Sequence, residues 1–178
     1  MLFNRYTTFL TATAAAVLLS ACASTGGNSD TEDLPRPQSG HWQIQSTDQT
    51  GQTITFNDCM DKETFYKTRQ LQKARRDVQQ CQTSSTKDSN GWQFNSNCKV
   101  GQTEQRVETS RKITGDFQTS FHVLSVTKQQ MPDNSVVETT RNIKGQYLGA
   151  CPAGMNPGDR QFEDGSKINF YDITGLNH

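Results

Sequence analysis

Trp42-Gln43-Ile44-Gln45-Ser46, followed after a turn by Gly51-Gln52-Thr53-Ile54-Thr55-Phe56, is the stretch of sequence that decides the fold. Trp42 and Ile44 alternate with polar residues before the turn, and Ile54 and Phe56 alternate with polar residues after it. Apolar side chains at a period of two on both sides of a turn predict a half-buried β-hairpin.

The same pattern returns further along the chain. Trp92-Gln93-Phe94-Asn95-Ser96 is followed by Gly101-Gln102-Thr103, which matches the order of residues in the first stretch. We therefore expect two similar hairpins. An ancient duplication would explain the match, and so would coincidence in a chain this rich in Gln, Thr and Ser.

The segment between the hairpins, Asp61 to Gln80, is the one helical stretch, and Asp61 can cap its start. Three apolar residues of its second half share a face: Leu71, Ala74 and Val78. At about 100° per residue Phe65 points nearly the opposite way. This mismatch predicts two short helices with a bend near Lys67 to Gln70.

The remainder of the domain has a β pattern with clear turns, such as Asn90-Gly91 and Gly115-Asp116. We expect an α+β fold, namely a curved antiparallel sheet or partly open barrel of about six to eight strands with one bent helical insertion. The domain spans residues 40–151. The tail 152–178 is expected to be loosely ordered, although Ile168-Asn169-Phe170-Tyr171 could form a short final strand.

The N-terminus has the features of an export signal. Arg5 precedes the apolar run Phe9 to Ala21, which is shorter than the roughly 20 residues of a membrane-spanning helix. The run ends in Leu19-Ser20-Ala21-Cys22, which resembles the lipoprotein box of bacterial lipoproteins. We predict a signal peptide at 1–21, lipidation of Cys22 and a flexible tether at 22–39. The alternative is an ordinary secretory signal cleaved at the same small residues.

Lipidation implies a location. Several acyl chains, palmitate among them, would hold the protein firmly on a membrane. The resemblance to bacterial lipoproteins implies sorting to the outer membrane, because Ala23 follows the cysteine where an inner-membrane protein would have Asp. The domain would then face the periplasm.

Composition limits the remaining possibilities. Lys+Arg and Asp+Glu both number 18, so no net charge steers the chain to nucleic acid, and we expect no nucleic-acid partner. The apolar content of 31% is low for a globular chain. A modest core in an oxidising compartment predicts stabilisation by disulfides.

Four cysteines remain for this purpose. Their spacing lacks the Cys-x-x-Cys pairs of zinc sites and favours disulfides, for which three connectivities exist. A bent helical segment would return Cys81 to Cys59, so we predict Cys59–Cys81 and Cys98–Cys151. A straight helix of roughly 30 Å would exclude the first bond. The alternative places Cys81 opposite Cys98, across a hairpin with a two-residue turn at Ser89-Asn90.

These landmarks together resemble a known family. They are Gly40-His41-Trp42, Cys59-Met60 before the helix, Cys81, the Ser-Asn-Gly turn, Cys98, Gly115-Asp116-Phe117 and Leu148-Gly149-Ala150-Cys151. The order is similar to that of the domain-of-unknown-function 3617 family of bacterial envelope proteins, over Gly40 to Cys151. The helical stretch here is more basic than that family suggests, and the tail is longer. The resemblance implies a fold and a compartment, and it brings no activity.

Catalytic and metal-binding patterns are absent from the sequence. The histidines are far apart: His41, His122 and His178. No metal-binding helix, nucleophile elbow or phosphate loop occurs. The carboxylates Asp58, Asp61 and Glu63 fit a helix start, and Glu163-Asp164-Gly165 fits a turn better than a calcium loop. We expect no enzyme activity, no metal and no cofactor.

Two classes of function fit these features. The first is a non-enzymatic, lipid-anchored module that binds a protein partner or another component of the envelope. The second is a carrier of a small apolar ligand, in a sheet pocket lined by Trp42, Trp92, Phe94, Phe117 and Phe121. A large apolar cavity flanked by the helix would favour the carrier, and a filled interior would favour the binding module.

Overall fold

The computed structural model describes residues 36–101 and 103–175. The strands are β1 (Gly40–Asp48), β2 (Thr53–Met60), β3 (Gln82–Asp88), β4 (Gly91–Lys99), β5 (Arg106–Gly115), β6 (Ser120–Gln130), β7 (Val136–Gly149), β8 (Asp159–Phe162) and β9 (Lys167–Asn169). The helices are α1 (Lys62–Val78) and α2 (Phe170–Thr174).

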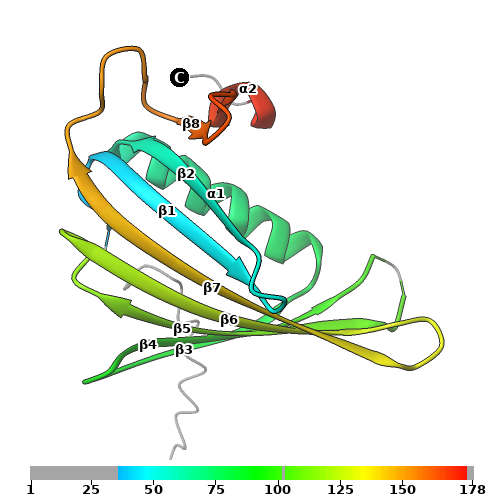
Figure 1. Ribbon diagram of the computed structural model, residues 1–178. Helices are drawn as coiled ribbons and strands as arrows, with labels where there is room; N and C mark the ends of the chain where they lie inside the picture. The colour runs from blue at the N-terminus through cyan, green and yellow to red at the C-terminus, as the bar shows by residue number, and fades with distance from the viewer. Residues whose placement is uncertain (1–35, 102, 176–178) are drawn as a thin grey trace, which may run out of the picture.

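All nine strands form one antiparallel sheet in the order β3-β4-β5-β6-β7-β1-β2-β8-β9. The sheet is strongly curved and α1 lies on its inner side (Figure 1). β3 and β9 do not pair with each other, so the sheet stays open. The expected antiparallel sheet is confirmed, but it has more strands than the six to eight predicted.

Both expected hairpins are present, as β1–β2 and β4–β5. Each begins with a glycine in a conformation that other residues rarely adopt: φ is +140° at Gly40 and +121° at Gly91. A Cβ atom would collide with a backbone carbonyl of the next strand, that of Gly149 or Ile113 respectively. The repeated Gly-x-Trp or Gly-Trp start therefore has a steric reason in both hairpins.

The core lies on the inner face of the sheet near β1. Trp42, Ile44 and Phe56 are buried there, and four partly buried residues pack against them: Phe121, Ile143, Tyr147 and Phe162. The indole N–H of Trp42 donates to the carbonyl of Gln38 at 2.7 Å. The alternating apolar residues of the first hairpin thus form the centre of the core, as their pattern predicts.

The predicted bend in the helical segment is wrong, because α1 is one helix of 17 residues. Asp61 caps it as expected, accepting the backbone N–H of Thr64 at 2.7 Å. The error came from the assumption that the apolar residues of its second half face the core. Val78 is 84% exposed and Ala74 is also exposed, while Phe65 lies on the side that faces the sheet.

The predicted disulfides Cys59–Cys81 and Cys98–Cys151 are also wrong. The bonds are Cys59–Cys151 and Cys81–Cys98, with Cα–Cα distances of 5.5 and 4.0 Å. A straight α1 keeps Cys59 and Cys81 at its opposite ends, about 25 Å apart. The alternative pairing of Cys81 with Cys98 is confirmed, because β3 and β4 are joined by the two-residue turn Ser89-Asn90.

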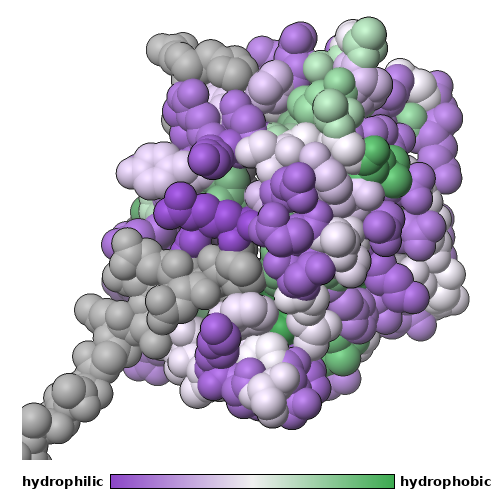
Figure 2. All heavy atoms as spheres, turned by 90° about the vertical axis from the view of Figure 1, so that its left-hand side faces the viewer, coloured by the Kyte–Doolittle hydropathy of each residue, from purple (hydrophilic) through white to green (hydrophobic). Residues whose placement is uncertain are grey.

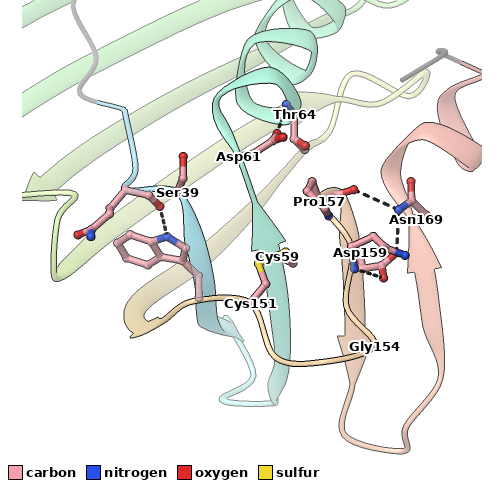
Figure 3. The surroundings of a disulfide bond; sticks show 12 residues. Ser39, Cys59, Asp61, Thr64, Cys151, Gly154, Pro157, Asp159 and Asn169 are labelled. Atoms are coloured by element: carbon pink, nitrogen blue, oxygen red, sulfur yellow. Dashed lines mark hydrogen bonds between the residues drawn. A yellow bond between two sulfur atoms is a disulfide. The ribbon is translucent and has the colours of Figure 1, made fainter.

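The tail was expected to be loosely ordered, and this expectation is wrong as far as Gly175. β8 pairs with β2, β9 pairs with β8, and Tyr171 of α2 is buried. Asp159 is 4% exposed and accepts hydrogen bonds from Asn156, Asn169 and Lys167. These bonds lie beside the Cys59–Cys151 disulfide (Figure 3). The folded unit therefore extends beyond residue 151.

Cys22, the signal at 1–21 and most of the expected tether lie outside the described residues. Among the residues that the structure describes, no helix is long and apolar enough to cross a membrane.

Candidate functional site

The aromatic residues expected to line a ligand pocket mostly pack against one another. Ring centroids are 5.4 Å apart between Trp42 and Phe121, 5.4 Å between Phe117 and Phe121, and 6.0 Å between Trp92 and Phe117. These rings fill the part of the inner face where the carrier hypothesis needs a cavity. Phe94, the fifth residue of the set, instead lies beneath α1.

A cleft opens between α1 and the sheet beside Phe94, with a volume of about 120 Å³. Its lining comes from one face of α1 and from β4 and β5: Phe65, Thr68, Arg69, Gln72, Arg76, Phe94, Arg111 and Ile113. The five helical residues of the lining stand at positions i, i+3, i+4, i+7 and i+11 from Phe65, which is the spacing of one helix face. The side of α1 that faces the sheet is therefore largely polar.

Both ends of α1 are fixed to the rest of the fold. Near its start, the hydroxyls of Thr64 and Tyr171 are 3.1 Å apart in a buried hydrogen bond. Just after its end, the carbonyl of Gln79 accepts the backbone N–H of Lys99 at 3.1 Å, and the Cys81–Cys98 disulfide follows. The walls of the cleft are thus held in place from both sides.

Three arginines line the cleft, Arg69, Arg76 and Arg111, and no acidic side chain does; Arg76 and Arg111 are the two whose charges act on each other. The guanidinium of Arg76 lies 5.9 Å from the centroid of the Phe94 ring, and Phe94 is the cross-strand partner of Arg111. Desolvation, and then the positive charge of Arg76, lower the pKa of Arg111. Among the described residues, no ion pair joins Arg76 or Arg111 to an acidic side chain. Two positive charges face each other here, so an anion between them would be stabilised.

The floor of the cleft is apolar. Phe94 is 5% exposed and Ile113 is 9% exposed, and Phe65 borders them from the helix. The hydroxyl of Thr68 already donates to the carbonyl of Thr64 at 2.7 Å, which leaves the amide of Gln72 as a neutral hydrogen-bonding group of the lining. Guanidinium groups stay protonated at neutral pH, so these groups are suited to binding rather than to proton transfer.

Several other polar residues noted in the sequence have structural partners, whereas the buried Nε2 of His41 has no hydrogen-bond partner among the described residues. Asp58 forms a bidentate pair with Arg160, at 2.7 Å for both bonds, and Asp164 accepts the N–H and hydroxyl of Ser166 within its turn. His122 is hydrogen-bonded to Asn142, and His178 lies outside the described residues. Within the described part of the chain, no group of three metal-ligating side chains occurs.

The two arginines were not identified from the sequence, although a signal for one was present. Val107 and Ile113 were predicted to share a face of their strand, and Arg111 alternates with them onto that same face. A charged residue on the face of a strand that bears the apolar residues is unusual and would have drawn attention to the position. Arg76 belonged to a basic helix that was interpreted as a solvated surface.

Fold and cleft define a class of protein: an open antiparallel sheet with a helix across its inner face and a cationic cleft between the two. The chain belongs to the DUF3617 family, described as proteins of unknown function, whose model matches residues 37–151. Neither the curated proteins nor the solved structures contain a match to this chain.

Proposed function

We propose that the chain is a lipid-anchored protein of the outer membrane, held through Cys22, whose domain is a non-enzymatic binding module in the periplasm. The observation that carries the binding function is the pair of guanidiniums, Arg76 and Arg111, in a cleft with an apolar floor. Arg76 and Arg111 repel each other and have no acidic partner among the described residues, and a binding role gives a reason for their presence.

Two further features support the proposed compartment. Both disulfides suit an oxidising environment such as the periplasm. The face drawn in Figure 2 is largely hydrophilic, with hydrophobic atoms in small separate areas, which suits a domain surrounded by water and attached through a lipid.

The carrier alternative has less support. Sites for small ligands are mostly apolar and enclose about 300–1,000 Å³, whereas this cleft has about 120 Å³. Two hollows of about 450 and 390 Å³ elsewhere on the sheet are lined mainly by polar residues, which does not suit an apolar ligand. The rings of Trp42, Phe117, Phe121 and Trp92 pack against one another and fill the space that a ligand would need. A long lipid chain would not fit in the cleft. One end of a ligand or of a partner would fit.

The anchor is tested by replacing Cys22 with Ser. We expect the protein to move from the membrane fraction to the soluble periplasmic fraction, and its mass to fall by that of the lost acyl chains. A protein that stays in the membrane with an unchanged mass would contradict the anchoring.

The binding module is tested by photo-crosslinking in intact cells. A photoreactive amino acid in place of Gln72, in the cleft lining, should give an adduct whose mass identifies a ligand or a partner. The same amino acid in place of Ala74, which lies on the outer side of α1, is the matched control. Equal labelling at both positions, or none at Gln72, would count against a binding role for the cleft.

A further inference from the structure

This inference rests on the proposed binding function and specifies the ligand. We infer that the cleft beneath α1 binds a small organic anion, with a carboxylate or similar oxyanion between Arg76 and Arg111 and an apolar group on Phe94 and Ile113. Three features of the cleft limit what the ligand can be: its positive charge, its size and its apolar floor. Each limit comes from a different observation.

The charge requirement comes from the two guanidiniums. Arg76 approaches from the last turn of α1 and Arg111 from the middle of β5, so they stand on opposite walls of the cleft. Guanidinium groups present several N–H donors in a plane and bind carboxylates through paired hydrogen bonds. An anion between the walls would neutralise the mutual repulsion and accept donors from both.

The size requirement comes from the volume. A cavity of about 120 Å³ is somewhat smaller than an engineered apolar cavity of about 150 Å³ that binds benzene. The apolar part of the ligand is therefore no larger than one aromatic ring or a short branched chain. Because Arg111 is exposed and Arg76 is half-buried, the charged end of the ligand can reach both guanidiniums from solvent.

The nature of the floor requires that the ligand combine both parts. A free inorganic anion would leave Phe94, Ile113 and Phe65 uncovered, and a neutral ring would leave the two charges facing each other. Burial of one aromatic face contributes roughly 25 cal/mol per Å² of apolar area. The two parts of the ligand should therefore bind much more tightly together than either does alone.

Three probes separate these contributions. Benzoate carries ring and charge, benzyl alcohol the ring without the charge, and acetate the charge without the ring. The full chain is exported so that both disulfides form, with Cys22→Ser to keep it out of membranes. Titration is followed by the NMR signals of the arginine Nε–H groups. We expect saturable shifts of Arg76 and Arg111 with benzoate, and an affinity at least about tenfold higher than for either other probe.

Variants localise the effect. Arg76→Gln and Arg111→Gln should each lower the affinity for benzoate about tenfold. Arg75→Gln removes the same charge from the same turn of α1, but Arg75 does not line the cleft. It should change the affinity less than twofold. A loss with Arg75→Gln equal to that with Arg76→Gln would overturn the inference, because a general charge effect would then explain the binding.

Salt gives a test that needs no cleft variant. Raising sodium chloride from about 20 to 200 mM should weaken benzoate binding several-fold and leave any binding of benzyl alcohol unchanged. Absence of a saturable benzoate shift, or equal affinities for benzoate and benzyl alcohol, would refute an anionic ligand. If the crosslink at Gln72 still identified a neutral ligand, the binding module would stand and only the ligand class would be wrong.

Discussion

Removing the two disulfides one at a time should destabilise the domain unequally. The Cys59–Cys151 bond joins residues 92 apart in the sequence, and the Cys81–Cys98 bond joins residues 17 apart. The chain-entropy relation gives about 4.6 kcal/mol for the long loop and about 3.1 kcal/mol for the short one. Cys59 is also 1% exposed, so its truncation leaves a small cavity that adds to the cost. The replacement of both cysteines of a pair with Ala should therefore cost at least about 1.5 kcal/mol more for Cys59–Cys151.

The assay is urea unfolding of the exported chain, followed by tryptophan fluorescence. Trp42 is fully buried and should report loss of the core. The free energy of unfolding of a typical domain is about 5–15 kcal/mol. At the lower end of this range, removal of the Cys59–Cys151 bond would leave a substantial part of the protein unfolded without urea. The reasoning is refuted if the Cys81–Cys98 variant loses as much stability as the Cys59–Cys151 variant or more.

The same two variants should rank in the opposite order in benzoate binding. Cys81–Cys98 holds the end of α1 on β4, next to the cleft, whereas Cys59–Cys151 lies near the start of α1 (Figure 3). Loss of the first bond should let α1 move away from the sheet and weaken benzoate binding several-fold. Loss of the second should leave the affinity of the still-folded molecules unchanged.

Three further substitutions test the fold. Arg160→Met leaves the buried carboxylate of Asp58 without its partner and should lower the free energy of unfolding in urea by about 3 kcal/mol. Asp58→Asn should lower it by only about 1 kcal/mol, because Arg160 is 39% exposed and can reach water. Gly145→Ala would place a methyl group in the ring of Phe121, at a cost of about 1–3 kcal/mol by the same assay. Hydrogen bonds from backbone N–H groups and from the Thr119 hydroxyl in the same turn lower the pKa of Asp116. The stability that the ionised carboxylate contributes is therefore present above pH about 4 and is lost as the pH falls further. Asp116→Asn should lower the urea midpoint at pH 7 more than at pH 2.5.

The sequence predicted best those features that depend on neighbours in the chain. Alternation of apolar residues around a turn defined both hairpins, because a strand places successive side chains on opposite faces. A two-residue turn at Ser89-Asn90 also fixes the register of β3 and β4, and the register alone puts Cys81 opposite Cys98. The correct pairing was therefore available from local turn geometry, without knowledge of the rest of the fold.

The features that were wrong depend on contacts between distant parts of the chain. The tail has few apolar residues, but Asp159 gains three hydrogen bonds and Arg160 pairs with Asp58 of β2, which orders it. Sequence separation of about 100 residues hides such a pair from any local pattern. Likewise, the face of α1 that meets the sheet is polar, so hydrophobic periodicity indicated the wrong side of the helix.

The error about α1, the disulfides and the cleft has a single physical origin. A helix with an apolar face would pack tightly on the sheet and leave no space beneath it. α1 instead turns Thr68, Gln72 and Arg76 inward, and these side chains do not seal against Phe94. Such a helix gains little from burial, so fixed ends must hold it in place: the Tyr171 hydrogen bond at one end and the Cys81–Cys98 bond at the other. The polar inner face that misled the prediction of a bent helix is thus the same feature that keeps the cleft open, and the Cys81–Cys98 bond holds the end of a helix that packing alone would not hold.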